Sequence, residues 1–408
     1  MLRVPVADRG PVFLRAMSPF RGGLAAARAV LRESFGYPAF RVHQLKVLGP
    51  LLAGRNVLAV LPTGAGKSLC FQVPALMAAG LTLVISPLIS LMQDQVGALR
   101  RRGIAAAYLN SLLAQEQRRV ILDAALGGAL RILYCAPERL ASLVRPLVHA
   151  GRPISLLAVD EAHCIVEWGN EFRPVYRRLD RFRYLLRDPV TIALTGSATP
   201  ATREEILRVL RIPAAETVIT SFDRPNLIFR AAPVADDRER FARVRALARA
   251  GDGSSIVYAP TRRLAELVTR ALLRTGVRAA PYHAGLTPGM RRTVLRAFLA
   301  GRAPVVVATS AFGMGIDKPD VRRVIHWGPP RSLEAYYQEA GRAGRDGDRA
   351  ECLLLWRRGE LAGAWGEAAP DVRRYLETRG CRRRVLLGYF GERDVRCAGC
   401  DACPERTR

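Results

Sequence analysis

Residues 61–68, with the sequence LPTGAGKS, restrict what this chain can fold into more than any other stretch. The apolar run at 56–61 is typical of a buried strand, and residues 69–79 have the spacing of a helix. A glycine-rich turn that joins a strand to a helix and ends in GKS is the phosphate-holding loop of nucleotide hydrolases. The sequence therefore predicts a nucleotide site on an α/β scaffold, with an ordinary glycine-rich turn as the alternative.

Each residue type in this loop has a physical reason to be there. Gly64 and Gly66 let the backbone curl so that several N–H groups point at one phosphate. Lys67 adds a positive charge for the outer phosphates, and the Ser68 hydroxyl is a suitable Mg²⁺ ligand. The usual pattern starts with a glycine where this chain has Leu61, so the loop departs from the pattern at its first position.

Short apolar runs recur along the chain, with helical stretches between them. Runs without polar alternation indicate strands that are covered on both faces, as in a parallel sheet. The turn-rich residues 223–226 (DRPN) divide these runs into two groups. We therefore expect two α/β domains in tandem, with strands at 56–61, 81–86, 132–135, 156–160 and 191–194 in the first and at 255–258, 277–282, 305–309, 323–326 and 351–355 in the second.

The charge balance indicates the kind of partner. The 408 residues include 63 Lys and Arg against 36 Asp and Glu, a formal net charge of +27, and only Lys46, Lys67 and Lys318 are lysines. This surplus favours a polyanion such as nucleic acid, although coding in a GC-rich genome also raises arginine content. The arginines are spread along the chain, which argues against a membrane-surface helix. No apolar run reaches the ~18–20 residues of a membrane span, so we expect a cytoplasmic protein.

A second chemical motif ends the apolar run at 156–159. Asp160 and Glu161 come directly after this strand, within the sequence DEAH. In nucleotide hydrolases an acidic residue in this place holds Mg²⁺ beside the phosphate loop, and Asp160 fits that role. Glu161 fits the role of the base that orients and polarises the attacking water. Two solvated carboxylates in a turn are the alternative, which the upstream GKS loop disfavours.

A glutamine and two arginines in the second half are candidates for the same site. Gln338, Arg342 and Arg345 lie in the segment 336–347, YYQEAGRAGRDG, and the arginines share one helical face. An arginine that reaches a phosphoryl group neutralises the charge that develops in the transition state. These side chains would act across a cleft between the two domains. A basic surface turn is the alternative.

The C-terminal cysteines form the last motif. Cys381, Cys397, Cys400 and Cys403 make two overlapping CxxC pairs with one cysteine upstream, a set suited to a tetrahedral thiolate site. An intracellular context argues against disulfides. We expect structural Zn²⁺, with an iron–sulfur cluster as the alternative, because four thiolates also bind iron.

Together these motifs resemble those of the RecQ family of superfamily 2 DNA helicases, in the family's order and over residues 31–408. The superfamily 2 form of the phosphate loop has no first glycine, which accounts for Leu61. The resemblance implies two RecA-like α/β domains with parallel sheets, followed by a small helical zinc module. The expected limits are a disordered extension at 1–23, the first domain at 24–220, the second at 221–356 and the zinc module at 357–408.

The resemblance also assigns residues to ATP, Mg²⁺ and catalysis. Residues 35–44 resemble the adenine-recognition motif, in which Tyr37 and Arg41 would sandwich the base and Gln44 would bond its edge. Arg342 and Arg345 inherit the contact with the γ-phosphate and the role of arginine finger. The implied nucleotide-binding set is Tyr37, Arg41, Gln44, Thr63, Gly64, Gly66, Lys67, Ser68 and Asp317, with Ser68 and Asp160 on Mg²⁺. The implied catalytic set is Lys67, Asp160, Glu161, Gln338, Arg342 and Arg345.

DNA contacts are implied at three further segments. The first strand-contacting motif at 86–95 includes Gln93, and residues 195–199 resemble the motif that couples hydrolysis to DNA. An aromatic-rich loop follows the acidic box, in which Trp168, Phe172 and Arg173 are suited to stack on unpaired bases. A local hydrophobic cluster is the alternative reading of these aromatics. The loop departs from the family at Val166, Glu167, Asn170 and Glu171, which puts its coupling to ATP in question.

The activity that the resemblance implies is ATP-dependent 3′-to-5′ DNA unwinding in repair or recombination, by a monomer that moves on single-stranded or tailed duplex DNA. Single-strand-binding or other repair proteins are expected further partners. The sequence ends five residues after Cys403, where many members continue into a winged-helix domain. An ATP-driven translocase or strand remodeller with little unwinding is therefore the alternative. An RNA-directed motor fits less well with the aromatic-rich loop, and a DNA-binding protein without hydrolysis fits less well with intact Lys67, Glu161 and Arg345.

Overall fold

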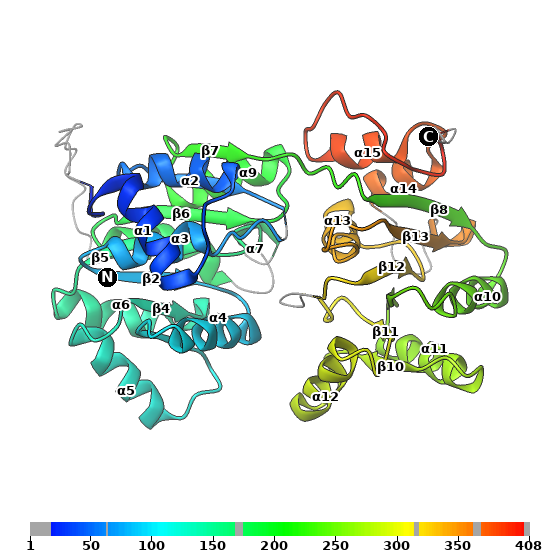
Figure 1. Ribbon diagram of the computed structural model, residues 1–408, viewed down its shortest axis with the longest axis horizontal. Coiled ribbons are helices and arrows are strands. Elements are labelled where there is room, and N and C mark those ends of the chain that lie inside the picture. The colour runs from blue at the N-terminus through cyan, green and yellow to red at the C-terminus, as the bar shows by residue number, and fades with distance from the viewer. Residues whose placement is uncertain (1–17, 63, 168–173, 314–317, 362–368, 404–408) are drawn as a thin grey trace, which may run out of the picture.

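The computed structural model contains two parallel β-sheets that follow one another along the chain (Figure 1). It describes residues 18–62, 64–167, 174–313, 318–361 and 369–403. The strands of the first sheet are β1 (Val57–Val60), β2 (Leu81–Ile85), β3 (Ala106–Leu109), β4 (Ile132–Cys135), β5 (Ile154–Val159), β6 (Val190–Thr195) and β7 (Glu216–Ile219). Those of the second are β8 (Leu227–Pro233), β9 (Ser254–Tyr258), β10 (Ala279–Tyr282), β11 (Val305–Ala308), β12 (Val321–His326) and β13 (Ala350–Trp356).

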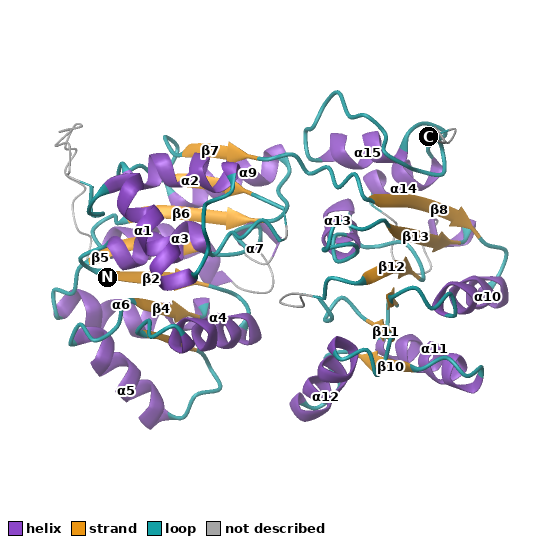
Figure 2. Cartoon of the chain, viewed as in Figure 1, coloured by secondary structure: helices purple, strands orange, loops and turns teal. Residues whose placement is uncertain are grey.

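Helices separate nearly all consecutive strands, as the alternating pattern predicts (Figure 2). Those of the first half are α1 (Gly23–Phe35), α2 (Val42–Leu52), α3 (Leu69–Met77), α4 (Ile89–Arg101), α5 (Gln115–Leu126), α6 (Leu140–His149), α7 (Cys164–Glu167), α8 (Leu179–Leu185) and α9 (Pro200–Leu210). Those of the second half are α10 (Asp237–Ala248), α11 (Arg262–Arg274), α12 (Pro288–Leu299), α13 (Leu333–Ala340), α14 (Pro370–Glu377) and α15 (Arg382–Tyr389).

The first sheet has the strand order β3-β4-β2-β5-β6-β1-β7, and every pair in it is parallel. Side chains of β1 alternate between two cores: Val57 and Ala59 pack with α1 to α4 on one face, and Leu58 and Val60 lie in the core on the other. A strand that must be apolar on both faces reads as an unbroken apolar run, which is why the sequence revealed it. In this sheet a single strand, β6, separates β1 from β5.

The second sheet has the order β10-β11-β9-β12-β13-β8, again with parallel pairs only. One face is covered by α10 and α11, whose Val244, Val268 and Leu272 are buried on it. Phe298 of α12 and Tyr336 of α13 lie in the core on the opposite face. Ser332 begins α13 by accepting a hydrogen bond from Ala335 N (3.1 Å), a cap that fixes where this helix starts.

All ten strands expected from the sequence are present, with ends that differ by a few residues. The strands β3, β7 and β8 were not predicted. Each lies at or next to an edge of its sheet, and β7 and β8 carry exposed residues that interrupt the apolar run. The expected disordered extension at 1–23 is too long, because Phe20 is 6% exposed and Ser18 Oγ donates to Leu52 O at 2.6 Å. Residues 1–17 lie outside the described chain.

The C-terminal helices α14 and α15 pack beside β8, close to the segment that joins the two sheets (Figure 1). Arg383 is fully buried there and its guanidinium binds the Asp223 carboxylate and Leu227 O. Phe222 stacks on Phe390, with ring centroids 4.8 Å apart. Arg203 of α9 donates to Phe390 O at 2.6 Å, so this module contacts both halves of the molecule. It therefore fixes the direction in which the chain leaves the first sheet.

We expect Glu392→Ala to loosen this connection. The Glu392 carboxylate accepts hydrogen bonds from Ser221 Oγ and from Phe222 N (2.9 Å), both in the connecting segment. Losing two hydrogen bonds to a charged acceptor should lower the free energy of unfolding by about 1–2 kcal/mol, as measured by urea titration. Glu377→Ala, an exposed glutamate at the end of α14, is the control. Equal stabilities of the two variants would contradict this account of the module.

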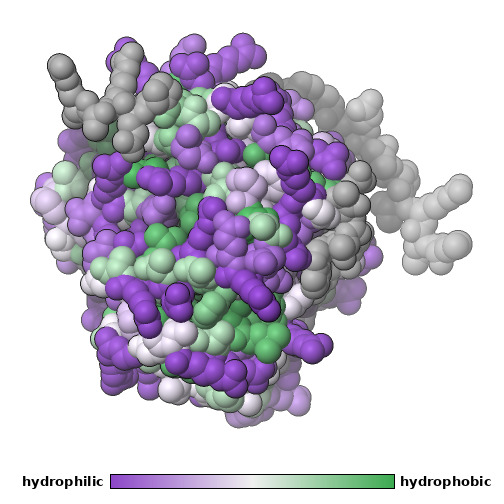
Figure 3. Space-filling model, turned by 90° about the vertical axis from the view of Figure 1, so that its right-hand side faces the viewer, coloured by the Kyte–Doolittle hydropathy of each residue, from purple (hydrophilic) through white to green (hydrophobic). Residues whose placement is uncertain are grey.

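The surface at one end of the molecule is mostly hydrophilic. Figure 3 views the end of the molecule that holds the second sheet, where hydrophilic side chains cover most of the face and apolar ones gather in its lower part. Among the residues that the structure describes, no helix combines the length and apolar character needed to cross a bilayer.

Candidate nucleotide site and metal centre

The phosphate loop follows β1 and precedes α3, as the sequence predicts. Gly64 and Gly66 have φ values of 83° and 75°, the left-handed region that glycine enters without strain. A Cβ on Gly66 would also lie 2.6 Å from Gln44 Nε2, so a larger residue there would displace the Gln44 amide. Lys67 Nζ lies 3.2 Å from Leu61 O, across the mouth of the loop. The backbone is therefore curled with the lysine folded over it.

The loop is held from outside by the start of α2. Gln44 is buried, and its Nε2 donates to Gly66 O (3.1 Å) while its Oε1 accepts from Arg41 N (2.8 Å). Arg41 Nη1 donates to Gly64 O (2.7 Å). His43 Nε2 lies 2.8 Å from Ala65 O and hydrogen-bonds it. These contacts place the expected adenine-recognition residues Arg41 and Gln44 directly against the phosphate loop. Tyr37 is 48% exposed, so its ring is available for stacking.

The acidic box follows the carboxyl end of β5, and the phosphate loop follows the carboxyl end of β1 in the same parallel sheet. Asp160 is buried, and burial together with the neighbouring Glu161 charge raises the pKa of Asp160 to about 7, against the lowering effect of Lys67. Lys67 and Asp160 are therefore close enough for their charges to interact. Glu161 adopts φ 48° and its N–H donates to Asp160 Oδ1 (3.1 Å). A left-handed non-glycine residue is strained, and such strain is concentrated at functional sites.

A chain of hydrogen bonds leads from the acidic box to the second half of the molecule. His163 Nδ1 lies 3.5 Å from Glu161 Oε2 and 2.9 Å from Thr195 Oγ1. The Thr195 hydroxyl donates its hydrogen to Ser197 O (2.8 Å), so it accepts from His163. Ser197 Oγ accepts from Gln338 Nε2 of α13 at 2.8 Å. Gln338 is thus the expected catalytic residue that the structure brings across to the first half.

The two arginines of the same segment have contacts inside the second half. Arg342 is buried, and its guanidinium binds Gly313 O and lies beside Tyr258. Arg345 is half-buried and also acts electrostatically on Tyr258. Burial raises the pKa of Tyr258 against the opposing effect of these two cations, so the phenol stays neutral. The role of arginine finger remains a prediction for Arg345, as does the γ-phosphate contact for Arg342.

The four C-terminal cysteines converge on one point. The Sγ atoms of Cys381, Cys397, Cys400 and Cys403 all lie within 4.8 Å of one another, and those of Cys397 and Cys400 are 3.6 Å apart. Tetrahedral thiolates at ~2.3 Å from Zn²⁺ have similar spacing. Burial raises the pKa of Cys400, but the Arg382 amide and neighbouring thiols lower it to about 7 overall. The donor set therefore fits a structural zinc ion.

The structure describes some of the other expected site residues and leaves others outside the described ranges. Gln93 is exposed on α4, where a ligand can reach it, and Ser68 is half-buried at the start of α3. Thr63, Asp317 and the DNA-stacking candidates Trp168, Phe172 and Arg173 lie outside the described residues. Two residues near the site were not predicted from the sequence: His43 on the phosphate loop, and the buried Glu334 on α13. A signal existed for Glu334, because it lies one helical turn before Gln338 on the same face.

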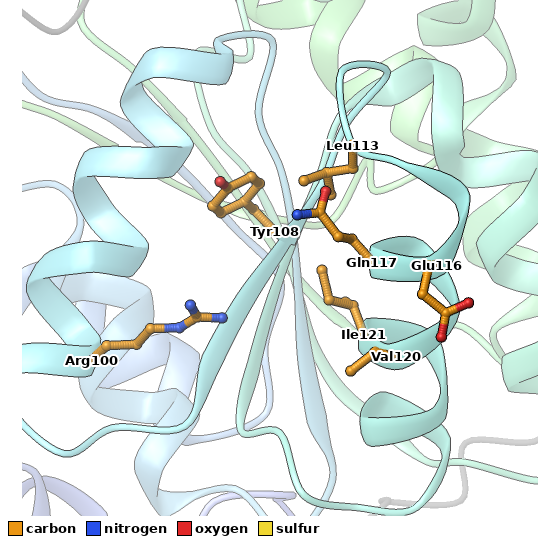
Figure 4. Close-up of a pocket in the computed structure, with 7 residues that line it drawn as sticks. All are labelled: Arg100, Tyr108, Leu113, Glu116, Gln117, Val120 and Ile121. Carbon is orange, nitrogen blue, oxygen red and sulfur yellow. The ribbon is translucent and has the colours of Figure 1, made fainter.

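One pocket lies away from this site. It has a volume of about 320 Å³ between α4, β3 and α5, and Figure 4 shows Arg100, Tyr108 and Gln117 around it. Because β3 is the far edge strand of the sheet, five positions from β1, this pocket is separate from the phosphate loop.

Three family models match the chain in succession. They are the DEAD/DEAH box helicase at residues 41–206, the helicase conserved C-terminal domain at 239–347 and the RecQ zinc-binding domain at 367–404. The first match covers the first sheet except β7, the second covers the second sheet except β8 and β13, and the third covers the cysteine module. Fold and matches together define the class: two domains of helicase families in tandem, followed by a module of the RecQ zinc-binding family.

Curated relatives narrow the class further. The chain is 41% identical to "ATP-dependent DNA helicase RecQ" of Haemophilus influenzae, over 92% of this chain and 63% of the relative. It is 40% identical to "Probable ATP-dependent DNA helicase RecS" of Bacillus subtilis, over 90% of this chain and 77% of the relative. This chain belongs to the RecQ family of helicases. It spans about three fifths of the Haemophilus relative's length.

Solved structures support the fold. One is the DUF1998 helicase MrfA bound to DNA and AMPPNP (TM-score 0.70, 22% identity, 95% of this chain and 56% of that chain). Another is the Mycobacterium smegmatis helicase Lhr bound to ssDNA and AMP-PNP (TM-score 0.66, 25% identity, 86% of this chain and 50% of that chain). The expected fold class is thereby confirmed: two RecA-like α/β domains in tandem.

Proposed function

We propose that this chain hydrolyses ATP between its two RecA-like domains and uses the cycle to move 3′-to-5′ on single-stranded DNA and separate duplexes. The observation that carries the proposal is the contact from Gln338 in the second domain to Ser197 in the first, 2.8 Å long. It links α13, which directly precedes the turn with the two arginines, to the strand ends that carry the phosphate loop and acidic box. A change at the nucleotide can therefore alter how the domains meet.

The residues of the first domain have separate tasks in this proposal. Lys67 and the N–H groups of its loop hold the outer phosphates of ATP. Ser68 and Asp160 would hold Mg²⁺, which supplies positive charge beside those phosphates. Glu161, next to Asp160, orients the attacking water and accepts its proton. Glu161 Oε2 also lies 3.5 Å from His163 Nδ1, the atom that donates to Thr195, so His163 positions the Glu161 carboxylate.

The second domain completes the site when the domains close. Arg342 and Arg345 neutralise charge on the transferring phosphoryl group. The contact of Gln338 with Ser197 couples the position of this segment to the first domain. Arg342 is bound to Gly313 O, so closure requires its guanidinium to exchange a backbone partner for phosphate. Release of phosphate then lets the domains separate, and repetition of this cycle moves the protein along DNA.

DNA binding in this proposal depends first on charge. A net charge of +27 attracts phosphates without regard to sequence, so affinity should fall steeply with salt. Gln93, Trp168, Phe172 and Arg173 are the proposed contacts, the aromatics by stacking on unpaired bases. The four-cysteine module would bind Zn²⁺ and support the connection between the domains. Single-strand-binding and repair proteins remain candidate partners of a cytoplasmic monomer.

Mg²⁺ binding should weaken as the pH falls from 8 to 6. The pKa of Asp160 is raised to about 7 by burial and by Glu161, and a carboxyl must lose its proton to ligate the metal. Protonation below that pKa therefore competes with Mg²⁺. We expect the Mg²⁺ concentration for half-maximal ATPase rate to rise several-fold from pH 8 to pH 6. An Asp160→Asn variant should lose this dependence, and a wild-type requirement that is independent of pH would contradict the assignment of Asp160.

Unwinding tests the proposal as a whole. ATP hydrolysis and strand separation are measured on duplexes with a 3′ tail, a 5′ tail or blunt ends, and on RNA of the same sequence. We expect DNA-stimulated hydrolysis and separation of the 3′-tailed duplex only. Hydrolysis without separation would favour a translocase or strand remodeller. Stimulation by RNA but not DNA would favour an RNA motor, and separation of the 5′-tailed duplex would reverse the proposed polarity.

A further inference from the structure

Gln72 connects the helix that follows the phosphate loop to the helix that carries a proposed DNA contact. It lies on α3, is 5% exposed, and its Nε2 donates to Gln95 Oε1 of α4 at 2.7 Å. The same nitrogen donates to Tyr134 Oη of β4 at 3.0 Å. An amide nitrogen carries two hydrogens, so these bonds use both of them. Gln72 therefore joins α3 to α4 and to the sheet.

Tyr134 fixes the orientation of the Gln72 amide. Its ring is 1% exposed and lies edge-on to Phe71 of α3, with ring centroids 6.3 Å apart. Breaking either bond of Gln72 would leave a buried polar group without a partner, which is costly. A shift of α4 is therefore passed to α3 through Gln72 instead of being absorbed by rotation of its side chain.

Gln72 lies in the first turn of the helix that begins at the phosphate loop. Gln72 N donates to Ser68 O at 2.9 Å, and Ser68 is the residue directly before α3. Residues joined by such a bond in one helical turn move together. Ser68 is the proposed Mg²⁺ ligand and follows Lys67 in the chain. A displacement of Gln72 therefore changes where the Ser68 hydroxyl and the Lys67 ammonium lie.

Gln95 and the proposed DNA contact Gln93 lie on nearly opposite sides of α4. At 3.6 residues per turn, two positions along a helix are about 200° apart. Gln93 is exposed, and Gln95 is half-buried with its side chain bonded to α3. DNA that binds Gln93 and shifts α4 thus moves Gln95 as well.

We propose that the Gln95–Gln72 hydrogen bond transmits DNA binding at α4 to the phosphate loop, so that Gln72 and Gln95 are positioning residues for DNA-stimulated hydrolysis. Neither side chain touches the nucleotide. They act on Ser68 and Lys67 through the first turn of α3. This route lies within the first domain, whereas the contact of Gln338 joins the two domains. The inference rests on the proposed function, because it requires ATP in the phosphate loop and DNA on α4.

The test compares ATP hydrolysis by the full chain without DNA and with saturating single-stranded DNA. Gln95→Ala removes the acceptor and should lower the DNA-stimulated kcat by about three- to ten-fold, the effect expected from one lost hydrogen bond. The rate without DNA and the DNA concentration for half-maximal stimulation should stay within about two-fold of wild type. Gln95→Glu keeps an acceptor of the same size and should retain most of the stimulation.

A second variant tests the other partner. Gln72→Met keeps the length of the side chain but removes both N–H donors, so it should reduce stimulation as Gln95→Ala does. The double variant should lose no more than either single variant, because both changes remove the same bond. Additive losses would overturn the inference. Loss of folding in Gln72→Met is checked by its thermal unfolding, and the Gln95 variants then still decide the outcome.

Controls separate the possible failures. Gln115→Ala, an exposed glutamine on α5, should keep both rates. A stimulated kcat of Gln95→Ala within two-fold of wild type overturns the inference while the ATPase stands. So does an equal loss of both rates, or a Gln95→Glu protein as poorly stimulated as Gln95→Ala.

Two further variants test what the inference requires. Gln93→Ala should raise the DNA concentration for half-maximal stimulation several-fold, because it removes a proposed DNA contact. An unchanged concentration would remove that contact and this inference with it. A wild-type rate equal to that of Lys67→Ala, with and without DNA, would instead remove the proposed ATPase function.

Discussion

The Lys67→Ala variant is expected to lose DNA-stimulated ATP hydrolysis by about 10²–10³-fold, the range seen when one preorganised electrostatic contact is removed from an active site. Lys67 lies over the phosphate loop, with Nζ 3.2 Å from Leu61 O, and acts electrostatically on Asp160. Its ammonium is the charge aimed at the outer phosphates. The measurement is the ATPase rate at saturating single-stranded DNA, with unwinding of a 3′-tailed duplex alongside.

The chain offers a matched control for this variant. Only Lys46, Lys67 and Lys318 are lysines, and Lys46 is exposed on α2. Lys46→Ala should therefore keep nearly the full rate, which separates the loss of one specific charge from a general loss of positive charge. A Lys67→Ala rate within two-fold of wild type would mean that the loop does not hold the reacting phosphates.

Loss of the metal centre should have the other large effect. Cys400→Ser should lower the zinc content from one ion per chain to nearly none, as measured by elemental analysis, and destabilise the C-terminal module. Structural zinc contributes about 10–16 kcal/mol of binding energy in isolated zinc-finger peptides, so several kcal/mol of stability are at stake here. Cys400 also pairs with Phe229 of β8, and Asp401 N donates to Phe229 O (3.2 Å). The second sheet should therefore become less stable as well.

A buried cysteine outside the cluster provides the control. Cys352 lies in β13 within the core, so Cys352→Ala should keep one zinc ion although it leaves a small cavity. Iron in place of zinc in the wild-type protein would reveal a cluster by its visible absorption. A Cys400→Ser protein with full zinc content would contradict the four-thiolate site.

The parts of the fold that the sequence predicted are those with one dominant physical signal. Central strands such as β1 and β5 are buried on both faces, so they read as unbroken apolar runs. Edge strands lack that signal. In β7 three of four residues are exposed, and β3 begins with two alanines, which have little preference for strands. Their pairing with neighbours, rather than their own composition, makes them strands.

The candidate site also has a part that was predictable from the sequence and a part that was not. Its chemistry was predictable, because GKS and DEAH restrict residue type and spacing through the needs of phosphate and Mg²⁺. The contacts between distant segments were not. Gln44 remains a predicted adenine contact, and its amide also binds the phosphate loop; Arg342 remains a predicted phosphate contact, and it also binds Gly313 O. Both side chains have hydrogen-bonding capacity for more than one partner, so their contacts within the protein follow from the packing around them.

The sequence by itself determined the class of protein, the phosphate loop, the acidic box and the four metal-binding cysteines, because these depend on residue type at fixed local spacing. Only the tertiary structure decided how the halves are connected. It placed Ser197 against Gln338, which is 141 positions away, and placed Arg383 under the connecting segment. Such contacts form between elements that no local pattern brings together. They arise where two packed sheets and the four-cysteine module meet.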